Sequence, residues 1–101
     1  RNKDRFEGKV PEPRKGLRSG SIKNSFCITF NNCWNKDNTF KNKDELKNVF
    51  KSCLESTNEK NIVFSCGSGV TACVLALAYS LINDKYRPCI YDGSWAEYGI
   101  I

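Results

Sequence analysis

A chain of 101 residues, 40% of them hydrophobic and 27% charged, is typical of a single globular domain. The formal net charge is +5, but Lys and Arg are scattered among Asp and Glu, as in "NKDELKN". This scatter disfavours nucleic acid as a partner, although the positive excess could attract a small anionic substrate. The longest apolar stretch, residues 70–82, contains polar residues and is too short to span a bilayer, so no membrane partner is expected.

The chain contains six cysteines and no histidine. Most of these cysteines lie in apolar runs, where cysteine behaves as a small buried hydrophobic residue. No Cys-x-x-Cys pair occurs, so neither a disulfide framework nor a metal site is expected. Residues 1–16 lack the apolar segment of a secretory signal peptide. Because unpaired thiols also favour a reducing compartment, the sequence predicts an intracellular protein.

The first half of the chain is predicted to contain one strand and one clear helix. Residues 1–21 are rich in Gly, Pro, Arg and Lys without any period, which predicts irregular backbone. Residues 26–30 are a candidate strand, with a helical turn expected near residues 33–34. A helix follows in which Asn42 and Glu45 can form a capping box. Its apolar residues recur at i, i+3, i+4, i+7 and i+8: Leu46, Val49, Phe50, Cys53 and Leu54.

The second half of the chain alternates buried strands with helices. After a polar loop at residues 58–61, residues 62–64 are apolar without alternation, as in a strand buried on both faces of a parallel sheet. The helix expected from Gly69 or the next residue is apolar on nearly every side and should be buried. Residues 89–91 form another short strand, and Ser94 can cap a last helix. This order predicts an α/β fold with a mainly parallel sheet and a ligand site at the carboxyl ends of its strands.

The segment "SCGSGVT" places a thiol, that of Cys66, between the strand at residues 62–64 and the next helix. Gly67 and Gly69 permit positive φ and close approach of backbone, so successive N–H groups can form an anion-binding nest. A helix N-terminus lowers the pKa of a thiol and supplies the reactive thiolate. These features favour a nucleophilic cysteine; the alternative is a glycine turn with an inert thiol.

Three kinds of anion chemistry are compatible with such a loop. A nucleotide-binding loop needs Lys after its glycines, and this chain has none there. A cysteine phosphatase usually has Arg six residues after its nucleophile, whereas this chain has Ala72. Sulfur transfer needs only N–H groups around a persulfide anion, so it fits these residues best.

The motifs "CGSGVTACVLALA", "YDGSWAEYG" and "RFEGKVPEPRKGLRSGSI" resemble the carboxyl-terminal catalytic rhodanese domain of the 3-mercaptopyruvate sulfurtransferases. The resemblance covers nearly all of residues 1–101. It implies a rhodanese-like three-layer α/β fold with a mainly parallel central sheet, lacking its first strand in this chain. It also implies an amino-terminal rhodanese-like domain, which this chain does not contain, and a cytoplasmic or mitochondrial location.

The resemblance implies a mechanism without a cofactor. Cys66 would take sulfur from 3-mercaptopyruvate, release pyruvate, and pass the sulfur to thioredoxin, a small thiol or cyanide. Arg5 and Arg14 match the arginines that bind the substrate carboxylate, and Ser68 matches a residue that relays protons with an Asp and a His of the amino-terminal domain. The loop that would hold the persulfide comprises Gly67, Ser68, Gly69, Val70 and Thr71.

Two alternatives to this function remain open. Thiosulfate sulfurtransferases carry Arg and Lys after the cysteine, which suit the thiosulfate dianion. Here these positions are the neutral Gly67 and Ser68, which favour mercaptopyruvate as the donor and leave thiosulfate as the alternative. The other alternative is a non-catalytic rhodanese-like module that binds an anion or a partner protein.

Overall fold

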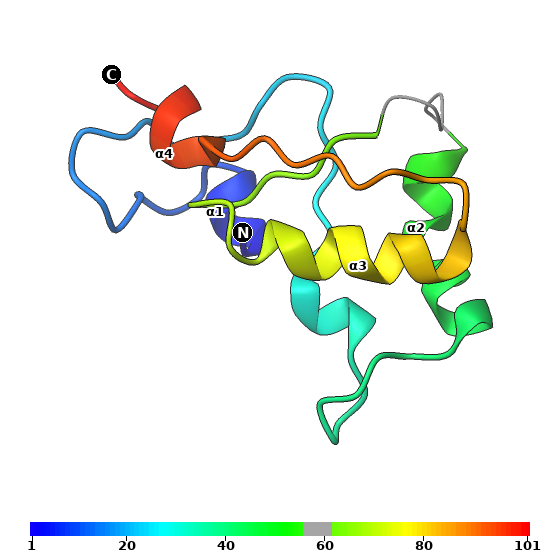
Figure 1. The fold of residues 1–101 in the computed structure, drawn as a ribbon. Coiled ribbons are helices and arrows are strands. Elements are labelled where there is room, and N and C mark those ends of the chain that lie inside the picture. The colour runs from blue at the N-terminus through cyan, green and yellow to red at the C-terminus, as the bar shows by residue number, and fades with distance from the viewer. Residues whose placement is uncertain (56–61) are drawn as a thin grey trace.

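The computed structural model describes residues 1–55 and 62–101 (Figure 1). The helices in chain order are α1 (Lys3–Phe6), the 3-10 helix η1 (Phe30–Cys33), α2 (Lys43–Leu54), α3 (Ala72–Ile82) and α4 (Ser94–Tyr98). Helix α3 crosses the middle of the molecule, and the extended segments that precede and follow it run alongside it (Figure 1). The polar loop predicted at residues 58–61 lies outside the described residues.

Helix α2 forms where the sequence predicts it. Asn42 Oδ1 accepts a hydrogen bond from Glu45 N at 2.9 Å, and Glu45 Oε1 accepts one from Asn42 N at 3.3 Å, which confirms the capping box. Leu46 and Phe50 on the predicted apolar stripe are buried. Local signals therefore determine both the start and the buried face of this helix.

Helix α3 differs from its prediction in two respects. It begins at Ala72 instead of near Gly69, because Gly69 adopts φ +95°, which is not a helical conformation. The two residues between Gly69 and Ala72 form a turn. The prediction that the helix is buried on nearly every side is wrong for the side that carries Leu77 and Leu81, which are 51% and 43% exposed. The opposite side packs into the core through Ala72, Leu75, Ala76, Ala78 and Tyr79.

Two of the three segments predicted as strands, residues 62–64 and 89–91, pair with each other at a single point. Phe64 and Ile90 form a parallel bridge, in which Phe64 N donates to Cys89 O at 2.9 Å and Tyr91 N donates to Phe64 O at 2.9 Å. Residues 26–29 form no β-bridge with the other described residues, and η1 begins at the last residue of the predicted strand. The bridge at Phe64 places the segment leading to Cys66 beside the segment leading to α4.

An aromatic cluster fixes the end of the segment that carries Cys66. Phe64 packs edge-on against Tyr86 at 6.1 Å between ring centroids, and Phe50 packs likewise against Tyr79 at 5.3 Å. Tyr79 and Tyr86 meet at 4.8 Å. Each such pair contributes roughly 0.5–1.5 kcal/mol beyond the burial of its surface. The cluster joins α2, α3 and the segment before Cys66 into one core.

The amino-terminal segment contains a helix that the sequence did not reveal. Helix α1 is short, and Asn2 Oδ1 caps it by accepting a hydrogen bond from Arg5 N at 2.8 Å. The remainder of residues 1–21 is irregular, as expected, and Arg18 N donates to Gly99 O at 2.8 Å. This contact holds the segment beside α4 (Figure 1).

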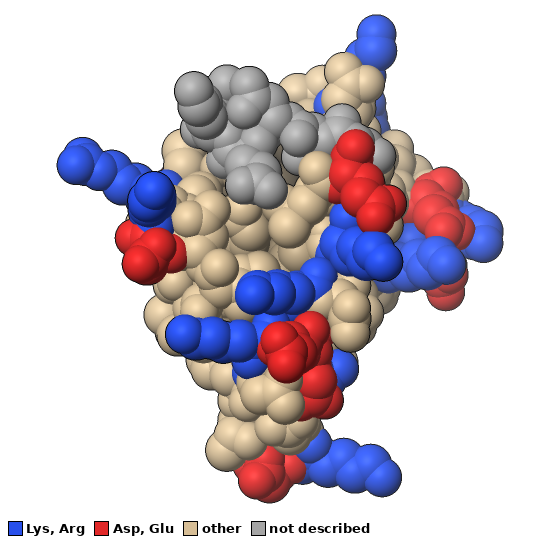
Figure 2. All heavy atoms as spheres, turned by 90° about the vertical axis from the view of Figure 1, so that its right-hand side faces the viewer, with Lys and Arg blue, Asp and Glu red and all other residues tan. Residues whose placement is uncertain are grey.

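Positive and negative side chains are mixed on the surface. On the face shown in Figure 2, Lys and Arg side chains stand beside Asp and Glu instead of forming one positive area. Elsewhere, Lys9 Nζ pairs with Glu7 Oε2 at 2.7 Å on the exposed turn after α1. In the part of the chain that the structure describes, no helix is long and apolar enough to cross a membrane.

Candidate active site

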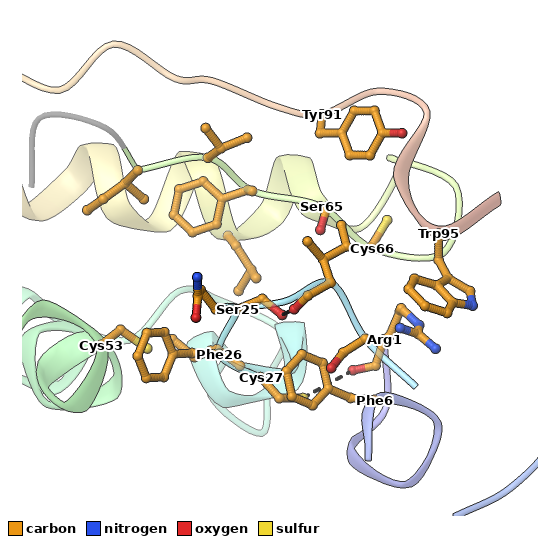
Figure 3. Close-up of a pocket in the computed structure, with 18 of the residues that line it drawn as sticks. Arg1, Phe6, Ser25, Phe26, Cys27, Cys53, Ser65, Cys66, Tyr91 and Trp95 are labelled. Atoms are coloured by element: carbon orange, nitrogen blue, oxygen red, sulfur yellow. Dashed lines mark hydrogen bonds between the residues drawn. The ribbon is translucent and has the colours of Figure 1, made fainter. Parts of the chain in front are cut away.

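Cys66 lies directly before the turn into α3, at the end of the segment that pairs with residues 89–91. Its side chain is buried, with the residue 4% exposed, and α4 holds its backbone. Cys66 N donates to Ser94 Oγ at 3.1 Å, and Trp95 N donates to Cys66 O at 3.0 Å. Figure 3 shows Trp95 beside the cysteine. The start of α4 therefore sets the position of the thiol.

Hydrogen-bond donors surround the sulfur of Cys66. Gly69 N donates to Cys66 Sγ at 2.9 Å. Burial raises the pKa of the Cys66 thiol, but the Thr71 hydroxyl and the backbone N–H groups of Ala72, Ser68 and Gly69 lower it more, to a pKa of about 7. A pKa in this range leaves part of the Cys66 side chains ionised at neutral pH, and the thiolate is the nucleophilic form of a thiol.

Gly69 is the residue in this loop that must lack a side chain. Its φ of +95° favours glycine, and a Cβ there would lie 2.8 Å from Asp92 O. Gly67 is less constrained, because a Cβ on it would meet Arg5 Nη2 at 3.4 Å, an ordinary contact distance. The same distance shows that the Arg5 guanidinium lies against the loop that follows Cys66.

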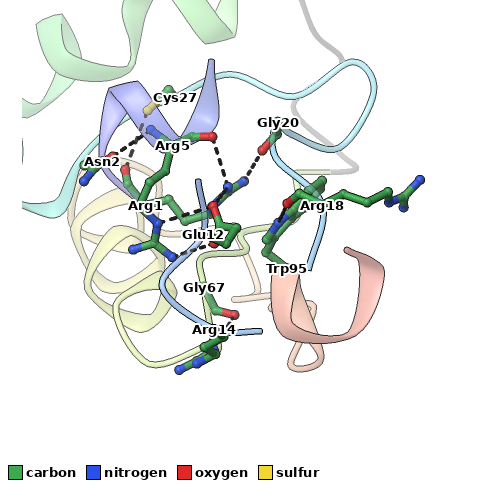
Figure 4. Close-up of polar contacts among 10 residues, drawn as sticks. All are labelled: Arg1, Asn2, Arg5, Glu12, Arg14, Arg18, Gly20, Cys27, Gly67 and Trp95. Atoms are coloured by element: carbon green, nitrogen blue, oxygen red, sulfur yellow. Dashed lines mark hydrogen bonds and ion pairs between the residues drawn. The ribbon is translucent and has the colours of Figure 1, made fainter. Parts of the chain in front are cut away.

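A pocket of about 380 Å³ opens in front of this loop. Arg5, from α1, and Arg14, from the irregular segment after it, both line the pocket. Arg14 Nη1 donates to Gly67 O at 3.3 Å (Figure 4). The predicted loop residues that line the same pocket are Cys66, Gly67, Ser68 and Thr71. The structure therefore brings both arginines to the thiol, while Val70, 72% exposed, is not among the lining residues.

A buried carboxylate, that of Glu12, holds Arg5 in place. Glu12 Oε1 accepts from Arg5 Nη2 at 2.8 Å, and Glu12 Oε2 accepts from Arg1 Nη2 at 2.6 Å (Figure 4). Burial raises the pKa of Glu12, but the hydrogen bonds from Arg5 and Arg1 lower it more, so the carboxyl stays ionised at neutral pH. No local pattern in the sequence distinguishes Glu12, although it lies in the same Pro-Glu-Pro-Arg motif as Arg14.

Comparison with known proteins places this site in a family. The family model described as the rhodanese-like domain matches residues 1–100. This chain belongs to the rhodanese-like domain family. The crystal structure of the Tum1 protein from Saccharomyces cerevisiae superposes on 97% of the chain with a TM-score of 0.79 and 27% sequence identity. The superposed part is 34% of the Tum1 chain.

Curated relatives of this rhodanese-like domain carry sulfurtransferase names. "Thiosulfate/3-mercaptopyruvate sulfurtransferase 1, mitochondrial" of Arabidopsis thaliana is 46% identical over 97% of the chain. "3-mercaptopyruvate sulfurtransferase" of Homo sapiens is 38% identical over 93%, and that of Escherichia coli strain K12 is 39% identical over 94%. The matched parts are 25%, 31% and 33% of these relatives, so the chain spans a quarter to a third of their length.

Ser94 has a different role in this rhodanese-like domain from the cap that its position predicted. Gly93 occupies the N-cap position of α4, and no side chain caps the helix. Ser94 is fully buried with φ +51°, and its Oγ donates to Tyr91 O at 2.8 Å while it accepts from Cys66 N. The cap prediction is wrong because the hydroxyl bonds to segments outside its helix. The motif "YDGSWAEYG" contains this serine, but periodicity gives no signal for the contact.

A second cavity, of about 530 Å³, is also lined by Cys66 (Figure 3). Its walls come mainly from residues 21–28 and 62–66, and most of them are apolar. Cys27 lines it and donates its thiol hydrogen to Arg1 O across 3.7 Å. Within residues 1–55 and 62–101, no group of three His, Cys, Asp or Glu side chains is arranged to hold a metal ion.

Proposed function

We propose that this rhodanese-like domain is the catalytic domain of a sulfurtransferase. It would move sulfur from 3-mercaptopyruvate through a persulfide on Cys66 to a thiol or cyanide acceptor. The observation that carries the proposal is a buried thiol with a pKa of about 7 that faces a pocket lined by Arg5 and Arg14. The names of the Arabidopsis, human and bacterial relatives support the same chemistry.

In the first step, the Cys66 thiolate attacks the sulfur atom of 3-mercaptopyruvate. A sulfur–sulfur bond forms and the carbon–sulfur bond breaks, so its electron pair leaves with the pyruvate enolate, which is then protonated. The negative terminal sulfur of the persulfide needs donors, and the N–H groups of the loop from Gly67 to Thr71 supply them. The acceptor thiolate, from thioredoxin or a small thiol, then attacks that terminal sulfur and regenerates Cys66.

The donor carboxylate would bind between Arg5 and Arg14, since a guanidinium can offer a carboxylate two parallel hydrogen bonds. Gly67 and Ser68 add no charge beside the sulfur, which suits the singly charged mercaptopyruvate. Thiosulfate is the second donor to test, because the Arabidopsis relative's name includes it.

Ser68 would relay protons with an Asp and a His supplied by an amino-terminal rhodanese-like domain. The exposed position of Ser68 at the mouth of the pocket supports this role. We also infer that the extended segments belong to a mainly parallel sheet in a three-layer fold, with its opening strand outside residues 1–101. The parallel bridge between Phe64 and Ile90 supports this arrangement. An intracellular location, cytoplasmic or mitochondrial, fits the Arabidopsis relative named as mitochondrial.

Replacement of the nucleophile tests the proposed function. In the full-length polypeptide, Cys66→Ser should reduce pyruvate release from 3-mercaptopyruvate to background, because a serine hydroxyl cannot form a persulfide. Cys89→Ser is the matched control, since Cys89 is exposed and does not line the 380 Å³ pocket. In the protein without substitutions, mass spectrometry after treatment with the sulfur donor should show one added sulfur atom on Cys66. Unchanged turnover in Cys66→Ser would contradict the proposal, and the absence of the added sulfur would favour a binding module.

A further inference from the structure

We propose that Glu12 is a positioning residue that fixes Arg5 to receive the carboxylate of the sulfur donor. The proposal rests on the function proposed above for Arg5. Glu12 does not line the 380 Å³ pocket, so it acts on the donor only through the arginine that it holds. Figure 4 shows its carboxylate between the guanidinium groups of Arg1 and Arg5.

The contacts of Glu12 determine which edge of Arg5 remains available. Arg5 Nη2 donates to Glu12 Oε1 at 2.8 Å, and Arg5 Nε donates to Glu12 Oε2 at 3.4 Å. Among the hydrogen bonds of the described residues, none uses Arg5 Nη1. The Arg5 side chain is 25% exposed, whereas that of Glu12 is 1% exposed. The buried carboxylate thus binds one edge of the guanidinium and leaves the other edge for a ligand in the pocket.

A second set of contacts ties Glu12 to the nucleophile. Arg1 donates to Glu12 Oε2 and, through Nη1, to Gly20 O at 2.6 Å. The Arg1 guanidinium also lies over the Trp95 ring, 4.5 Å from its centroid, and Trp95 N donates to Cys66 O. Glu12, Arg1 and Trp95 therefore form a continuous path from Arg5 to the backbone of Cys66. This path connects the proposed carboxylate-binding group to the residue that carries the reacting sulfur.

Fixing Arg5 before the donor arrives has a physical advantage. An arginine side chain loses much rotamer entropy when a ligand orders it, and this loss weakens binding. In this protein the charge-assisted hydrogen bonds to Glu12 already impose the order. The competing interpretation is that Glu12 only cancels positive charge beside the pocket. The two interpretations predict opposite effects when the charge of Glu12 is removed. Removal of a masking charge would strengthen the attraction for an anion, whereas loss of the contact that fixes Arg5 would weaken it.

Two alkylating reagents of nearly the same shape separate these interpretations. Iodoacetate carries a carboxylate and iodoacetamide does not, so the ratio of their rates at Cys66, followed by peptide mass spectrometry, measures carboxylate recognition. In the full-length polypeptide, Glu12→Gln should lower this ratio about tenfold, as expected when a charge-assisted hydrogen bond is lost. An unchanged or higher ratio would overturn the proposal.

Glu7→Gln is the matched control, because it makes the same change of charge on the same segment. Glu7 pairs with exposed Lys3 and Lys9 and does not line the 380 Å³ pocket, so the ratio should stay as in the unmodified protein. An equal fall in Glu7→Gln would mean that the fall does not depend on the contact between Glu12 and Arg5, which would also overturn the proposal.

A double replacement tests whether Glu12 acts through Arg5. Once Arg5→Gln has removed the guanidinium, adding Glu12→Gln should not lower the ratio further; an equal further fall would contradict the proposal. If Glu12→Gln fails to fold, Glu12→Asp keeps the charge for Arg1 but is one methylene shorter. It should then give the same direction of change, and an unchanged ratio would count against the proposal.

Turnover of 3-mercaptopyruvate separates this inference from the proposed function. With Glu12→Gln, KM should rise about tenfold while kcat changes much less, because the lost interaction acts on donor binding. If the unmodified protein does not release pyruvate but the alkylation ratio falls in Glu12→Gln, the proposed substrate is wrong and the role of Glu12 stands. If turnover is normal and neither KM nor the ratio changes in the variant, the role of Glu12 is wrong by itself.

Discussion

Gly69 controls the geometry of the hydrogen bond at the reactive sulfur. Its N–H group reaches Cys66 Sγ only because the backbone adopts φ +95°, a region that residues with a Cβ rarely occupy. The carbonyl oxygen of Asp92 fills the space where that Cβ would lie. One residue therefore links the turn before α3 to the ionisation of the Cys66 thiol.

Gly69→Ala should shift the pH dependence of Cys66 alkylation to higher pH. The new Cβ must move away from Asp92 O, which carries the Gly69 N–H off the sulfur. The Thr71 hydroxyl and the N–H groups of Ala72, Ser68 and Gly69 lower the pKa of Cys66, so loss of the Gly69 donor lets the pKa rise above about 7 and leaves less thiolate at neutral pH. The measurement is the rate of iodoacetamide reaction at Cys66 from pH 5 to 9.

Gly16→Ala is the control for backbone strain in this experiment. Gly16 also has a positive φ, +80°, but nothing lies within 4 Å of the Cβ position. Its replacement should leave the midpoint for Cys66 near pH 7. A midpoint that also stays near pH 7 in Gly69→Ala would show that this N–H group does not set the reactivity of the thiol.

Helix α4 acts as a support for the loop that follows Cys66, although it is a single short element. The Ser94 hydroxyl and the N–H groups of Trp95 and Ala96 bond to the backbone of Cys66 and Gly67. These contacts hold the start of the loop, at Cys66 and Gly67, while α3 begins directly after the end of the loop. The loop is therefore held at its start by α4, which is distant in the sequence, and at its end by the adjoining α3.

Ser94→Ala should destabilise the protein by about 1–3 kcal/mol, because the buried N–H of Cys66 loses its acceptor. Urea unfolding at neutral pH measures this free energy. Ser80→Ala is the control: its hydroxyl bonds only to Leu77 O within α3, so little change is expected. An equally small effect of Ser94→Ala would indicate that water satisfies the Cys66 N–H.

At the scale of elements, the sequence predicts what local contacts determine. The capping box and apolar stripe of α2 lie within a few residues of one another, and both are confirmed. The contact of Ser94 with Cys66 and the pairing of Phe64 with Ile90 join residues far apart in the chain. Periodicity carries no information about such pairs.

At the scale of the whole molecule, the candidate site depends on contacts between the amino-terminal segment and α4, near the carboxyl terminus. Arg5 and Arg14 have the local appearance of surface charges, and only the family resemblance pointed to the pocket. The fold brings them to Cys66 because the amino-terminal segment lies along α4 and Arg1 packs over Trp95. The buried Glu12 compensates the charge of the arginines gathered there, which no pattern in the sequence shows.

This buried charge cluster predicts how the stability of the protein depends on pH. The hydrogen bonds from Arg5 and Arg1 depress the pKa of Glu12, so the cluster contributes stability above the ordinary glutamate pKa of about 4.3. That contribution is lost as the pH falls through the lower pKa of the folded protein. At pH 7, Glu12→Gln should therefore lower the free energy of unfolding by about 1–3 kcal/mol.

The difference in stability between the unmodified protein and Glu12→Gln should narrow progressively below pH 4.3, as Glu12 itself becomes neutral. Urea unfolding at a series of pH values measures it. Asp37→Asn is the exposed control, since the Asp37 carboxylate accepts hydrogen bonds from nearby Thr39 on the surface and should show a much smaller difference throughout. An unchanged difference between pH 7 and pH 3 would mean that the charge of Glu12 does not bind the amino-terminal segment to α4, and that its side chain contributes only through packing.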